Sequence, residues 1–427
     1  MEIKKLHQLF LNSSGVCTDT RSLNNNQLFF ALKGDSFDGN QYAVKAIEDG
    51  ACFAIIDDPK IIHSKAILVE NVLQTLQELA NFHRNYLSIP IIALTGSNGK
   101  TTTKELIHAV IKTKFNCTAT YGNLNNHIGV PLTLLKMDTS TEIGVVEMGA
   151  NHLYEIDQLC KVAQPNFGYI TNIGKAHLEG FGSEENILLG KTELYRHLDT
   201  NKGIIFGNIE DAILTEKSKK SNAIYFSNTS KSDYQIKFIE AQPFVKVLVK
   251  ETEINSNLIG AYNYTNIAAS IAIGLYFGID ITAIKQAIEK YIPANNRSQL
   301  IKTKTNQLIL DAYNANPSSM TAAIKNFEND HTKKDNKVVI LGDMFELGQY
   351  SEKEHQSIVS HLENSKINQI FLAGDHFFDC STNSKKIAFF KSTTSLISHL
   401  KTYPISNSAI LIKGSRGMKL EQTTEFL

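Results

Sequence analysis

The sequence predicts an α/β protein of three domains, and three observations support this prediction. The chain has 427 residues, enough for about two to four domains with buried cores. Short aliphatic runs alternate with helix-compatible stretches along most of it, a pattern typical of parallel sheets covered by helices. One such run, residues 91–94, leads directly into a glycine-rich turn and a helix-compatible segment. We therefore expect domains at residues 1–85, 86–298 and 299–427.

The first domain is expected to be a small α/β unit. Strand-like runs at 27–32 and 51–56 flank a helix-like run at 42–49. Two polar segments, 18–22 and 30–39, lie beside the predicted strand ends, where ligands of α/β sheets often bind. Ordinary turn chemistry is the alternative explanation of both segments.

The central domain is predicted to be a mostly parallel sheet with helices on both faces. After the glycine-rich turn we expect strands at 143–148, 167–173 and 203–206, short alternating strands within 223–258, and helices at 154–162, 184–198, 262–278 and 281–291. The third domain repeats the strand–helix rhythm, with strands expected at 308–310, 338–341, 370–373 and 409–412. Residues 333–337 and 382–386 are predicted to be solvated loops.

Composition excludes several classes of protein. The 43 basic and 43 acidic residues balance, so bulk charge predicts no binding to nucleic acid. The five cysteines are scattered, without metal-finger spacing, which indicates reduced thiols in the cytoplasm. No apolar run reaches about 18 residues and the N-terminus lacks a signal-peptide core, so we expect a cytoplasmic protein without membrane insertion.

The glycine-rich turn has the chemistry of a phosphate site. Glycines let backbone N–H groups converge on phosphate oxygens, the following helix N-terminus adds positive charge, Lys100 can reach the terminal phosphates, and the Thr101 hydroxyl can ligate Mg²⁺. Leu94 stands where the common P-loop has a glycine, so only a shortened form of the motif fits. A glycine turn that simply joins strand to helix is the alternative.

Further candidates follow later strands. Glu147 ends a predicted strand beside the phosphate loop, where it is placed to ligate Mg²⁺, although helix capping or simple exposure also explains a glutamate there. His177 lies in the loop after another strand, and a lone histidine can equally be structural. Asn263 and Asn266 share one face of a predicted helix, and Arg297 follows near the domain boundary, where a guanidinium can meet phosphates.

The loop Thr-Gly-Ser-Asn-Gly-Lys-Thr-Thr resembles that of the Mur ligase superfamily, which makes amide bonds during peptidoglycan assembly. The third domain begins with Asp-Ala-Tyr-Asn-Ala-Asn-Pro-Ser-Ser-Met at 311–320 and continues with Leu-Gly-Asp-Met-Phe-Glu-Leu-Gly at 341–348 and Lys-Gly-Ser-Arg-Gly-Met at 413–418. These stretches look like those of the member that adds D-alanyl-D-alanine, and they arrive in family order. The resemblance implies a uridine-nucleotide domain, a P-loop-type ATPase domain and a Rossmann-like C-terminal domain.

The resemblance also implies roles for individual residues. The ATP site would comprise Gly96, Ser97, Asn98, Gly99, Lys100, Thr101, Thr102, Asn263, Asn266, Arg297, Asp311 and Tyr313. The UDP-linked substrate would contact Thr20, Arg21, Lys33, Gly34, Asn125 and Asn126. Two Mg²⁺ ions would be faced by Thr101, Glu147 and His177, and catalysis would use Lys100, His177 and a carbamylated Lys191, which residue pattern alone would place on a helix surface. The dipeptide, or domain closure, would involve Asn314, Asn316, Lys413 and Arg416.

The activity implied is ATP-dependent addition of D-alanyl-D-alanine to a UDP-N-acetylmuramoyl tripeptide through an acyl phosphate, by a monomer whose third domain closes on the second. Two other hypotheses remain. An enzyme resembling folylpolyglutamate synthase would lack the first domain and the Tyr-Asn-Ala-Asn-Pro segment. A P-loop switch or transport ATPase would need partner-dependent hydrolysis, and the missing glycine and the third α/β domain argue against it.

Overall fold

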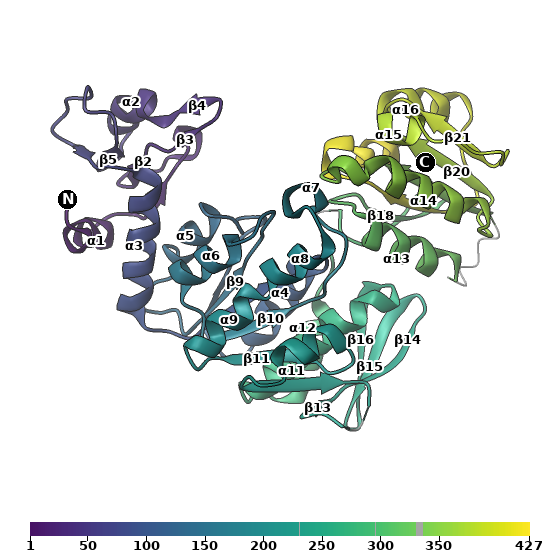
Figure 1. Cartoon of the computed structure of the whole chain (residues 1–427), viewed down its shortest axis with the longest axis horizontal. Helices are drawn as coiled ribbons and strands as arrows, with labels where there is room; N and C mark the ends of the chain where they lie inside the picture. Colours follow the sequence, from purple (N-terminus) through teal and green to yellow (C-terminus); the bar gives the residue numbers. More distant parts are fainter. Residues whose placement is uncertain (230, 295, 330–335) are drawn as a thin grey trace.

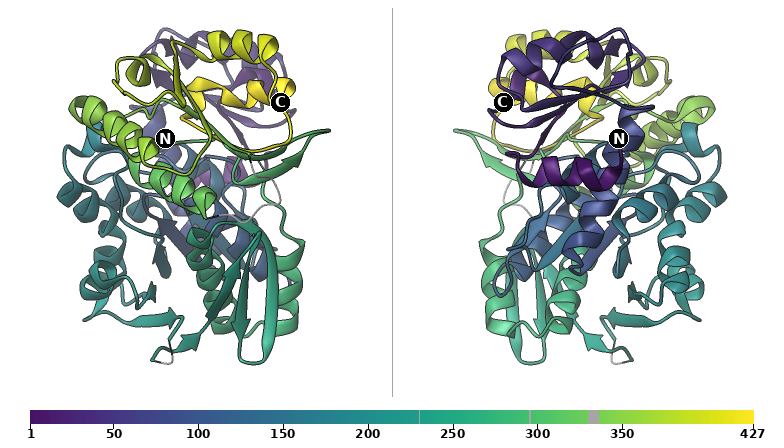
Figure 2. Two further views of the ribbon diagram at one scale, coloured as in Figure 1. Left: turned by 90° about the vertical axis from the view of Figure 1, so that its right-hand side faces the viewer. Right: turned by 90° about the vertical axis from the view of Figure 1, so that its left-hand side faces the viewer.

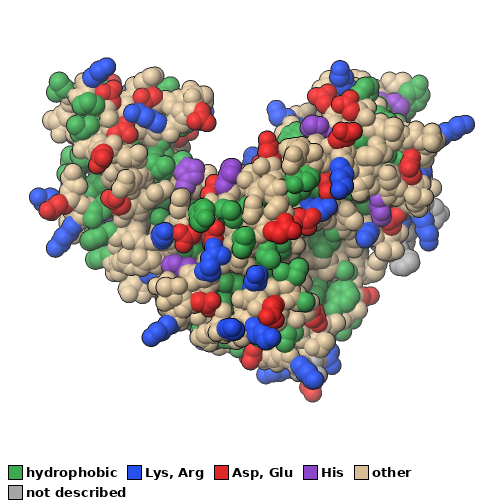
Figure 3. Space-filling view, viewed as in Figure 1, with side chains coloured by type: hydrophobic (Ala, Val, Ile, Leu, Met, Phe, Trp, Pro, Cys, Tyr) green, Lys and Arg blue, Asp and Glu red, His purple; other side chains and the backbone are tan. Residues whose placement is uncertain are grey.

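Three α/β units follow one another along the chain and form a V, with the N-terminal and C-terminal units as its arms (Figure 1). The structure, a computed structural model, describes residues 1–229, 231–294, 296–329 and 336–427. Residues 333–335 of the loop predicted at 333–337 lie outside the described residues. Seen along the line joining the arms, both stand above the central unit (Figure 2). The space-filling view shows the notch between them (Figure 3).

The N-terminal unit contains a parallel sheet of strand order β1-β2-β5-β6. Its strands are β1 (Val16–Cys17), β2 (Leu28–Phe30), β5 (Phe53–Ile56) and β6 (Ala66–Leu68), with helices α1 (Ile3–Leu11) and α2 (Ala43–Glu48) and the short helices η1 (Thr20–Ser22) and η2 (Gly39–Tyr42). A separate hairpin joins β3 (Lys33–Gly34) to β4 (Phe37–Asp38), on the side of the unit that faces the notch (Figure 1). The small α/β unit predicted for this segment is confirmed.

Helix α3 (Val72–Leu87) links the N-terminal and central units. It packs on α1 and β2 of the former and on α5 (Gly129–Leu134) and α6 (Glu155–Ala163) of the latter. Near its end, the buried Arg84 donates from Nε to the carbonyl of Ala163 (3.0 Å) and from Nη2 to Asn166 Oδ1 (3.0 Å). The first bond satisfies the last carbonyl of α6, which has no partner within that helix. The boundary predicted near residue 85 therefore falls inside a helix anchored on both sides.

The central sheet is parallel, with strand order β13-β12-β11-β10-β7-β9-β8 among the described residues. Its strands are β7 (Ile91–Thr95), β8 (Cys117–Ala119), β9 (Ile143–Glu147), β10 (Phe167–Ile170), β11 (Ile204–Asn208), β12 (Ala223–Ser227) and β13 (Tyr234–Gln235). From β7 the chain runs through α4 (Lys100–Ile111) to β8 and then to β9, which both lie on one side of β7 in the strand order. It then crosses over β7, so that β10 lies on the other side of it. The crevice outside the carboxyl ends of strands at such a reversal is where ligands of α/β sheets bind.

Alternate residues of the central strands supply two cores, because successive side chains of a strand point to opposite faces. Ile91 and Ala93 of β7 belong to the core beneath α5, α6 and α9 (Glu193–Thr200). Ile92 and Leu94 belong to the core beneath α4, α11 (Tyr264–Tyr276) and α12 (Ile281–Lys290). Both faces of the sheet are therefore buried, and only its strand ends remain open to a ligand. The predicted mostly parallel sheet with helices on both faces is confirmed.

One predicted helix is wrong in its extent. Residues 184–198 form two helices, α8 (Glu184–Lys191) and α9, which meet at Thr192. The break lets the buried Glu193 cap α6: its two carboxylate oxygens accept from the N–H groups of Tyr154 (2.7 Å) and Asp157 (2.9 Å). This tertiary contact overrides a sequence that local propensity alone would continue as one helix. The strand predicted at 167–173 also ends earlier, at Ile170.

The rest of the central unit comprises short elements and an antiparallel sheet, β14-β15-β16. These elements are α7 (Leu178–Phe181), α10 (Ala212–Ser218), β14 (Lys237–Ala241), β15 (Phe244–Val249), β16 (Thr252–Ile259) and η3 (Ala261–Asn263). The short alternating strands predicted within 223–258 are confirmed.

The C-terminal unit has strand order β17-β18-β22-β19-β20-β21, parallel except for the β17–β18 pair. The strands are β17 (Gln299–Lys302), β18 (Gln307–Asp311), β19 (Asn336–Gly342), β20 (Gln369–Ala373), β21 (Ile387–Phe390) and β22 (Ser408–Lys413). Its helices are α13 (Pro317–Glu328), α14 (Ser351–Glu363), α15 (Asp375–Phe378), α16 (Thr393–Thr402), η4 (Gly348–Tyr350), η5 (Arg416–Met418) and η6 (Leu420–Phe426). The loops after the neighbouring strands β18, β22 and β19 meet at one sheet edge, which faces the central unit.

Candidate active site

The loop between β7 and α4 needs glycine at two positions. Gly96 has a φ of +140°, and a Cβ there would clash with the Thr171 hydroxyl. Gly99 has a φ of +80°, and its Cβ would lie 2.6 Å from Asn266 Oδ1. Positive φ together with close neighbours excludes other residues, so the backbone can turn its N–H groups toward a ligand at the start of α4.

The segment after β10 braces this loop. Ser97 Oγ donates to the carbonyl of Gly174 (2.9 Å), and Thr171 Oγ1 donates to the carbonyl of Asn98 (2.6 Å). Asn172 also donates to that carbonyl (3.0 Å) and accepts from the N–H of Asn98 (3.0 Å). The loop is thus held in shape by bonds that leave several of its backbone N–H groups free for phosphate oxygens.

Lys100 lies folded against the loop that it follows. Its Nζ donates to the carbonyls of Gly96 (2.7 Å) and Ser97 (3.3 Å). Burial lowers the pKa of this amine, while the nearby Glu147 carboxylate raises it. A bound phosphate would supply the negative charge that favours the ammonium form, so the site is built for an anion.

Glu147, at the end of β9, has the geometry of a metal ligand. Its Oε1 accepts from the Thr101 hydroxyl (3.2 Å) and from Asn125 Nδ2 (2.8 Å). Its Oε2 is buried and has no hydrogen-bond partner among the described residues. A buried carboxylate oxygen without a partner is costly unless a cation binds there. The oxygen donors of Glu147 and Thr101 fit Mg²⁺.

Asn263 and Asn266, at the start of α11, brace the phosphate loop through the first turn of α4. Asn266 Oδ1 accepts from Thr103 Oγ1 (3.0 Å), its Nδ2 donates to Asn263 Oδ1 (2.8 Å), and Asn263 Nδ2 donates to the carbonyl of Ile259 (2.8 Å). Both residues are buried and line the cavity described below. Much of their hydrogen-bonding capacity is therefore used to hold the phosphate loop in place.

The C-terminal unit contacts the same loop. Asn316 Nδ2 donates to Asn98 Oδ1 (2.7 Å), and Ser318 Oγ accepts from the N–H of Lys175 (2.9 Å). At the neighbouring strand ends, the buried Lys413 Nζ donates to Asp311 Oδ2 (2.6 Å). The Asn316–Asn98 bond thus joins the loop after β18 directly to the phosphate loop.

A cavity of about 750 Å³ lies between the two units. Most of the predicted site residues line it: Ser97, Asn98, Gly99, Lys100, Thr101, Thr102, Asn125, Asn126, Glu147, His177, Asn263, Asn266, Arg297, Asp311, Tyr313, Asn314, Asn316 and Lys413. Arg297 stacks on Tyr313, its guanidinium carbon 3.5 Å from the ring centroid, and Arg416 lies over the same ring at 5.4 Å. The cavity thus combines a phosphate loop, a carboxylate and a stacked arginine.

Other predicted residues lie outside the lining. Gly96 belongs to the phosphate loop without lining the cavity, Arg416 is exposed, and Lys191 is fully buried. In the N-terminal unit, Arg21 pairs with Asp19 (2.6 Å) and Lys33 pairs with Asp57 (2.8 Å). The N-terminal unit thus holds four predicted residues away from the cavity, on the other arm of the V: Thr20, Arg21, Lys33 and Gly34.

Lys191 lies in an apolar environment. Its Nζ donates to the carbonyl of Ala150 (2.8 Å) and lies 5.2 Å from the centre of the Phe181 ring. Burial, followed by the nearby Lys100 charge, lowers its pKa well below the usual value. The neutral amine that this favours is a nucleophile, which is the form that reacts with CO₂.

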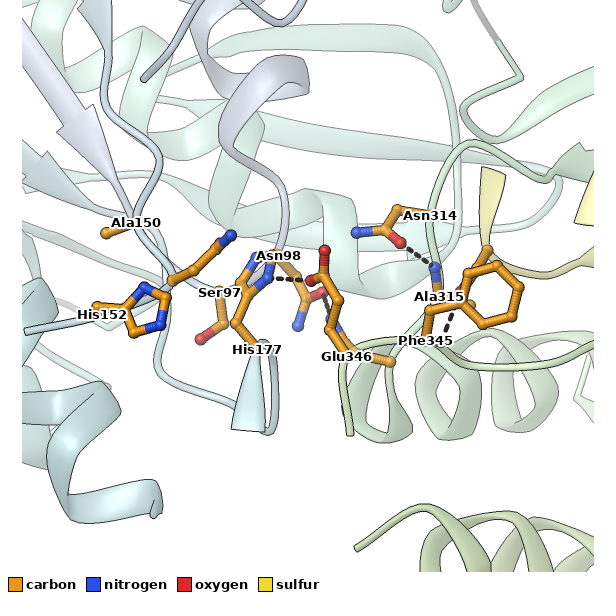
Figure 4. A network of polar contacts seen from close by, with 12 residues as sticks. Ser97, Asn98, Ala150, His152, His177, Asn314, Ala315, Phe345 and Glu346 are labelled. Atoms are coloured by element: carbon orange, nitrogen blue, oxygen red, sulfur yellow. Dashed lines mark hydrogen bonds and ion pairs between the residues drawn. The ribbon is translucent and has the colours of Figure 1, made fainter. Parts of the chain in front are cut away.

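His177 is paired with a residue that sequence reasoning missed. Its Nδ1 makes a short contact with the Oε2 of Glu346, in the loop after β19, and Figure 4 shows the two side chains pointing toward each other from different units. Burial lowers the pKa of His177, and the hydrogen bond from His177 lowers the pKa of Glu346. The position of Glu346 in a polar loop after a strand was the available signal.

Comparison with known proteins identifies the family of this chain. Three family models match successive segments: the Mur ligase family catalytic domain at residues 12–92, the Mur ligase middle domain at 94–274, and the Mur ligase glutamate ligase domain at 296–416. A Bacillus subtilis UDP-N-acetylmuramoyl-tripeptide–D-alanyl-D-alanine ligase is 36% identical, over 97% of this chain and 93% of that protein. The chain belongs to the Mur ligase family.

Further Mur ligases are similar to this chain over nearly its whole length. The Escherichia coli enzyme of the same name is 33% identical, over 96% of this chain and 93% of its own. Among solved structures, MurF from Acinetobacter baumannii has a TM-score of 0.87 at 28% identity, covering 98% of this chain and 97% of that one. MurF from Thermotoga maritima, solved with ADP, has a TM-score of 0.85 at 26% identity and the same coverage.

A folylpolyglutamate synthase from Mycobacterium tuberculosis shares the fold alone, with a TM-score of 0.62 at 14% identity over 83% of this chain. Among the described residues, no helix is long and apolar enough to cross a membrane.

Proposed function

We propose that this chain uses ATP to join D-alanyl-D-alanine to the free carboxylate of a UDP-N-acetylmuramoyl tripeptide in peptidoglycan precursor synthesis. The observation that carries the proposal is the Asn316–Asn98 bond, which joins the Tyr-Asn-Ala-Asn-Pro loop of the C-terminal unit to the phosphate loop. The full-length similarity to ligases of this name supports the same choice. We further propose that the enzyme is a cytoplasmic monomer.

The reaction proceeds in two balanced steps. The substrate carboxylate attacks the γ-phosphorus of ATP, which forms an acyl phosphate and releases ADP. The amine of the dipeptide then attacks the acyl carbon, loses a proton, and expels inorganic phosphate as the amide forms. A carboxylate needs this activation because oxide is a very poor leaving group. The protein mainly positions the reactants and neutralises charge.

The residues of the proposed site, within the cavity and on the N-terminal arm, have distinct roles in these steps. Backbone N–H groups of the phosphate loop and the Lys100 ammonium hold the γ-phosphate and the charge that develops on it. Arg297, stacked on Tyr313, offers a planar pair of donors to ATP phosphates. Asn125 and Asn126 face the sugar-peptide substrate, while Asn314, Lys413 and Arg416 serve the dipeptide or closure. Thr20, Arg21, Lys33 and Gly34 hold the uridine nucleotide on the other arm.

Two Mg²⁺ ions fit the residues present. The partnerless Glu147 oxygen and the Thr101 hydroxyl would hold one, and His177 with a carbamylated Lys191 would face the second. No cluster of three or more His, Cys, Asp or Glu side chains is arranged to hold a metal in the described part of the chain, so nucleotide phosphates and water would complete each site. When bound, the ions neutralise phosphate charge during transfer.

The environment of Lys191 supports its carbamylation. Its buried neutral amine would attack CO₂ and lose a proton, which yields a carbamate whose negative charge a bound Mg²⁺ would offset. Lys191 would thereby become an anionic group on the metal side of the cavity.

Phosphate release from ATP tests the function. We expect release only when UDP-N-acetylmuramoyl tripeptide and D-alanyl-D-alanine are both present, with a product heavier by the dipeptide residue. Assays with single amino acids, or with a folate substrate, are the matched comparisons. Release with a single amino acid or a folate, and none with the dipeptide, would overturn the proposed substrate while leaving the ATP-dependent ligase chemistry.

A further inference from the structure

Glu346 and His177 meet at the boundary between the C-terminal and central units. The contact joins Glu346 Oε2 to His177 Nδ1, and the side chains are 51% and 18% exposed. Both residues have a positive φ, +62° for Glu346 and +57° for His177. Residues other than glycine rarely adopt this conformation, and it persists where the surrounding structure enforces it. Two such residues in direct contact indicate a specifically built arrangement.

The surrounding contacts fix Glu346 against the central unit. Its carbonyl accepts from the N–H of Glu179 (3.0 Å) at the start of α7. Nearby, Tyr350 Oη donates to the carbonyl of Gly182 (2.9 Å), and Lys175 pairs with Glu354 (2.7 Å). Glu346 therefore reaches His177 as part of a wider docking contact, from a loop of the other unit.

The chemistry of imidazole gives this contact a consequence. When Nδ1 carries the proton and donates to a carboxylate, Nε2 keeps a lone pair that points away from that carboxylate. A histidine that binds a metal is held in one tautomer by such a partner on its second nitrogen. His177 also lines the cavity, on the side where Lys100 and Lys191 lie within electrostatic reach.

We propose that Glu346 is a positioning residue that holds His177 in the Nδ1-protonated tautomer and thereby links binding of the second Mg²⁺ to docking of the C-terminal unit. This inference rests on the proposed function, which assigns His177 to the second ion. Because the carboxylate comes from the C-terminal unit, the histidine acquires its orienting partner only when the two units are docked.

The tautomer of His177 is the first measurement, made by long-range proton–nitrogen NMR on the full chain with ¹⁵N-labelled histidine. His177→Gln assigns the signal. We expect the Nδ1-protonated form in the wild type and, only slightly less, in Glu354→Gln, a matched control that removes the charge of one other docking contact without touching His177. We expect Glu346→Ala to lose this preference, and Glu346→Gln, whose amide oxygen can still accept, to keep it. An unchanged tautomer in Glu346→Ala would overturn the proposal.

Mn²⁺ binding is the second measurement, followed by electron paramagnetic resonance with a non-hydrolysable ATP analogue. We expect the more weakly bound of the two ions to bind about 10-fold less tightly to Glu346→Ala. Its affinity should fall by a much smaller factor in Glu354→Gln, because a partly exposed ion pair contributes little to docking. An equal loss in both variants would make Glu346 a docking contact only and overturn the proposal. A wild-type chain that releases no phosphate with both substrates would instead overturn the proposed function, whereas the tautomer is measured without substrates.

Discussion

The bond between Asn316 and Asn98 can be separated from the rest of Asn316 by choice of substitution. Asn316 has two roles: its Oδ1 caps α13 by accepting from the N–H of Ser319 (2.9 Å), and its Nδ2 donates to Asn98 Oδ1 (2.7 Å) in the central unit. Serine is also a good N-cap but is too short to reach Asn98. Asn316→Ser therefore removes the contact between units, and Asn316→Ala removes both contacts.

The expected magnitudes follow from these two bonds. A neutral hydrogen bond contributes about 0.5–1.5 kcal/mol net, so losing the Asn98 contact should lower the equilibrium constant for docking by about 2- to 13-fold. Loss of the cap costs about 1 kcal/mol more in the stability of the C-terminal unit. We expect kcat/KM for phosphate release to fall by about 2- to 13-fold in both variants, and the free energy of unfolding to fall further only in Asn316→Ala.

Urea unfolding and steady-state phosphate release measure the two effects. Ser392→Ala is the matched control, because Ser392 forms the same kind of capping box at the start of α16 in the same unit, outside the cavity lining. It should lower stability by about 1 kcal/mol and leave kcat/KM unchanged. Wild-type kcat/KM in Asn316→Ser, or an equal loss in Ser392→Ala, would refute the docking role of this bond.

Three further predictions concern separate features. Lys191→Met should lower ligation by about 100-fold or more, because the anionic group facing the metal is lost; native mass spectrometry should find one added CO₂ on the wild type and none on this variant. Tyr313→Ala should weaken ADP binding by about 2- to 30-fold through loss of the Arg297 stack, whereas Tyr313→Phe should bind normally in calorimetry. The buried pair His7 and His83 (Nε2 to Nδ1, 3.0 Å) has lowered pKa values, chiefly through burial. Below about pH 6.5 the unfolded chain binds protons that the folded pair excludes, so stability should fall by up to about 1.4 kcal/mol per pH unit for each histidine. His7→Phe should reduce that slope in urea unfolding, and an unchanged slope would contradict the assignment.

Local patterns predicted the elements well where a single physical cause decides them. The aliphatic run of β7 followed by glycines could form only a buried strand that ends in a tight turn, and the structure has both. The helix predicted over 184–198 failed because its break depends on Glu193 capping a different helix, α6. Such a contact is invisible to periodicity, which reports only on neighbours within one element.

The site shows the same division. That Lys100, Thr101 and Glu147 lie together could be predicted, because phosphate and metal chemistry favour those residue types at strand ends. The contact between Glu346 and His177 could not, because it depends on how a loop of the C-terminal unit docks on a segment about 170 residues away in sequence. The burial of Lys191 likewise comes from packing of Phe181 and the loop carrying Ala150, which the residue pattern of its own helix does not report.

Helix α3 gives the V a fixed span. It is continuous from Val72 to Leu87 and packs on both units. His83 is bonded both to His7 of the N-terminal unit and to the carbonyl of Met137 of the central unit, so the N-terminal arm is not joined by a flexible linker. With the uridine nucleotide held on that arm, as proposed, the distance from there to the phosphate loop is set by the protein. A substrate must then bridge this distance for its carboxylate to reach ATP. We therefore expect the enzyme to reject peptides that are too short even when their end groups are correct.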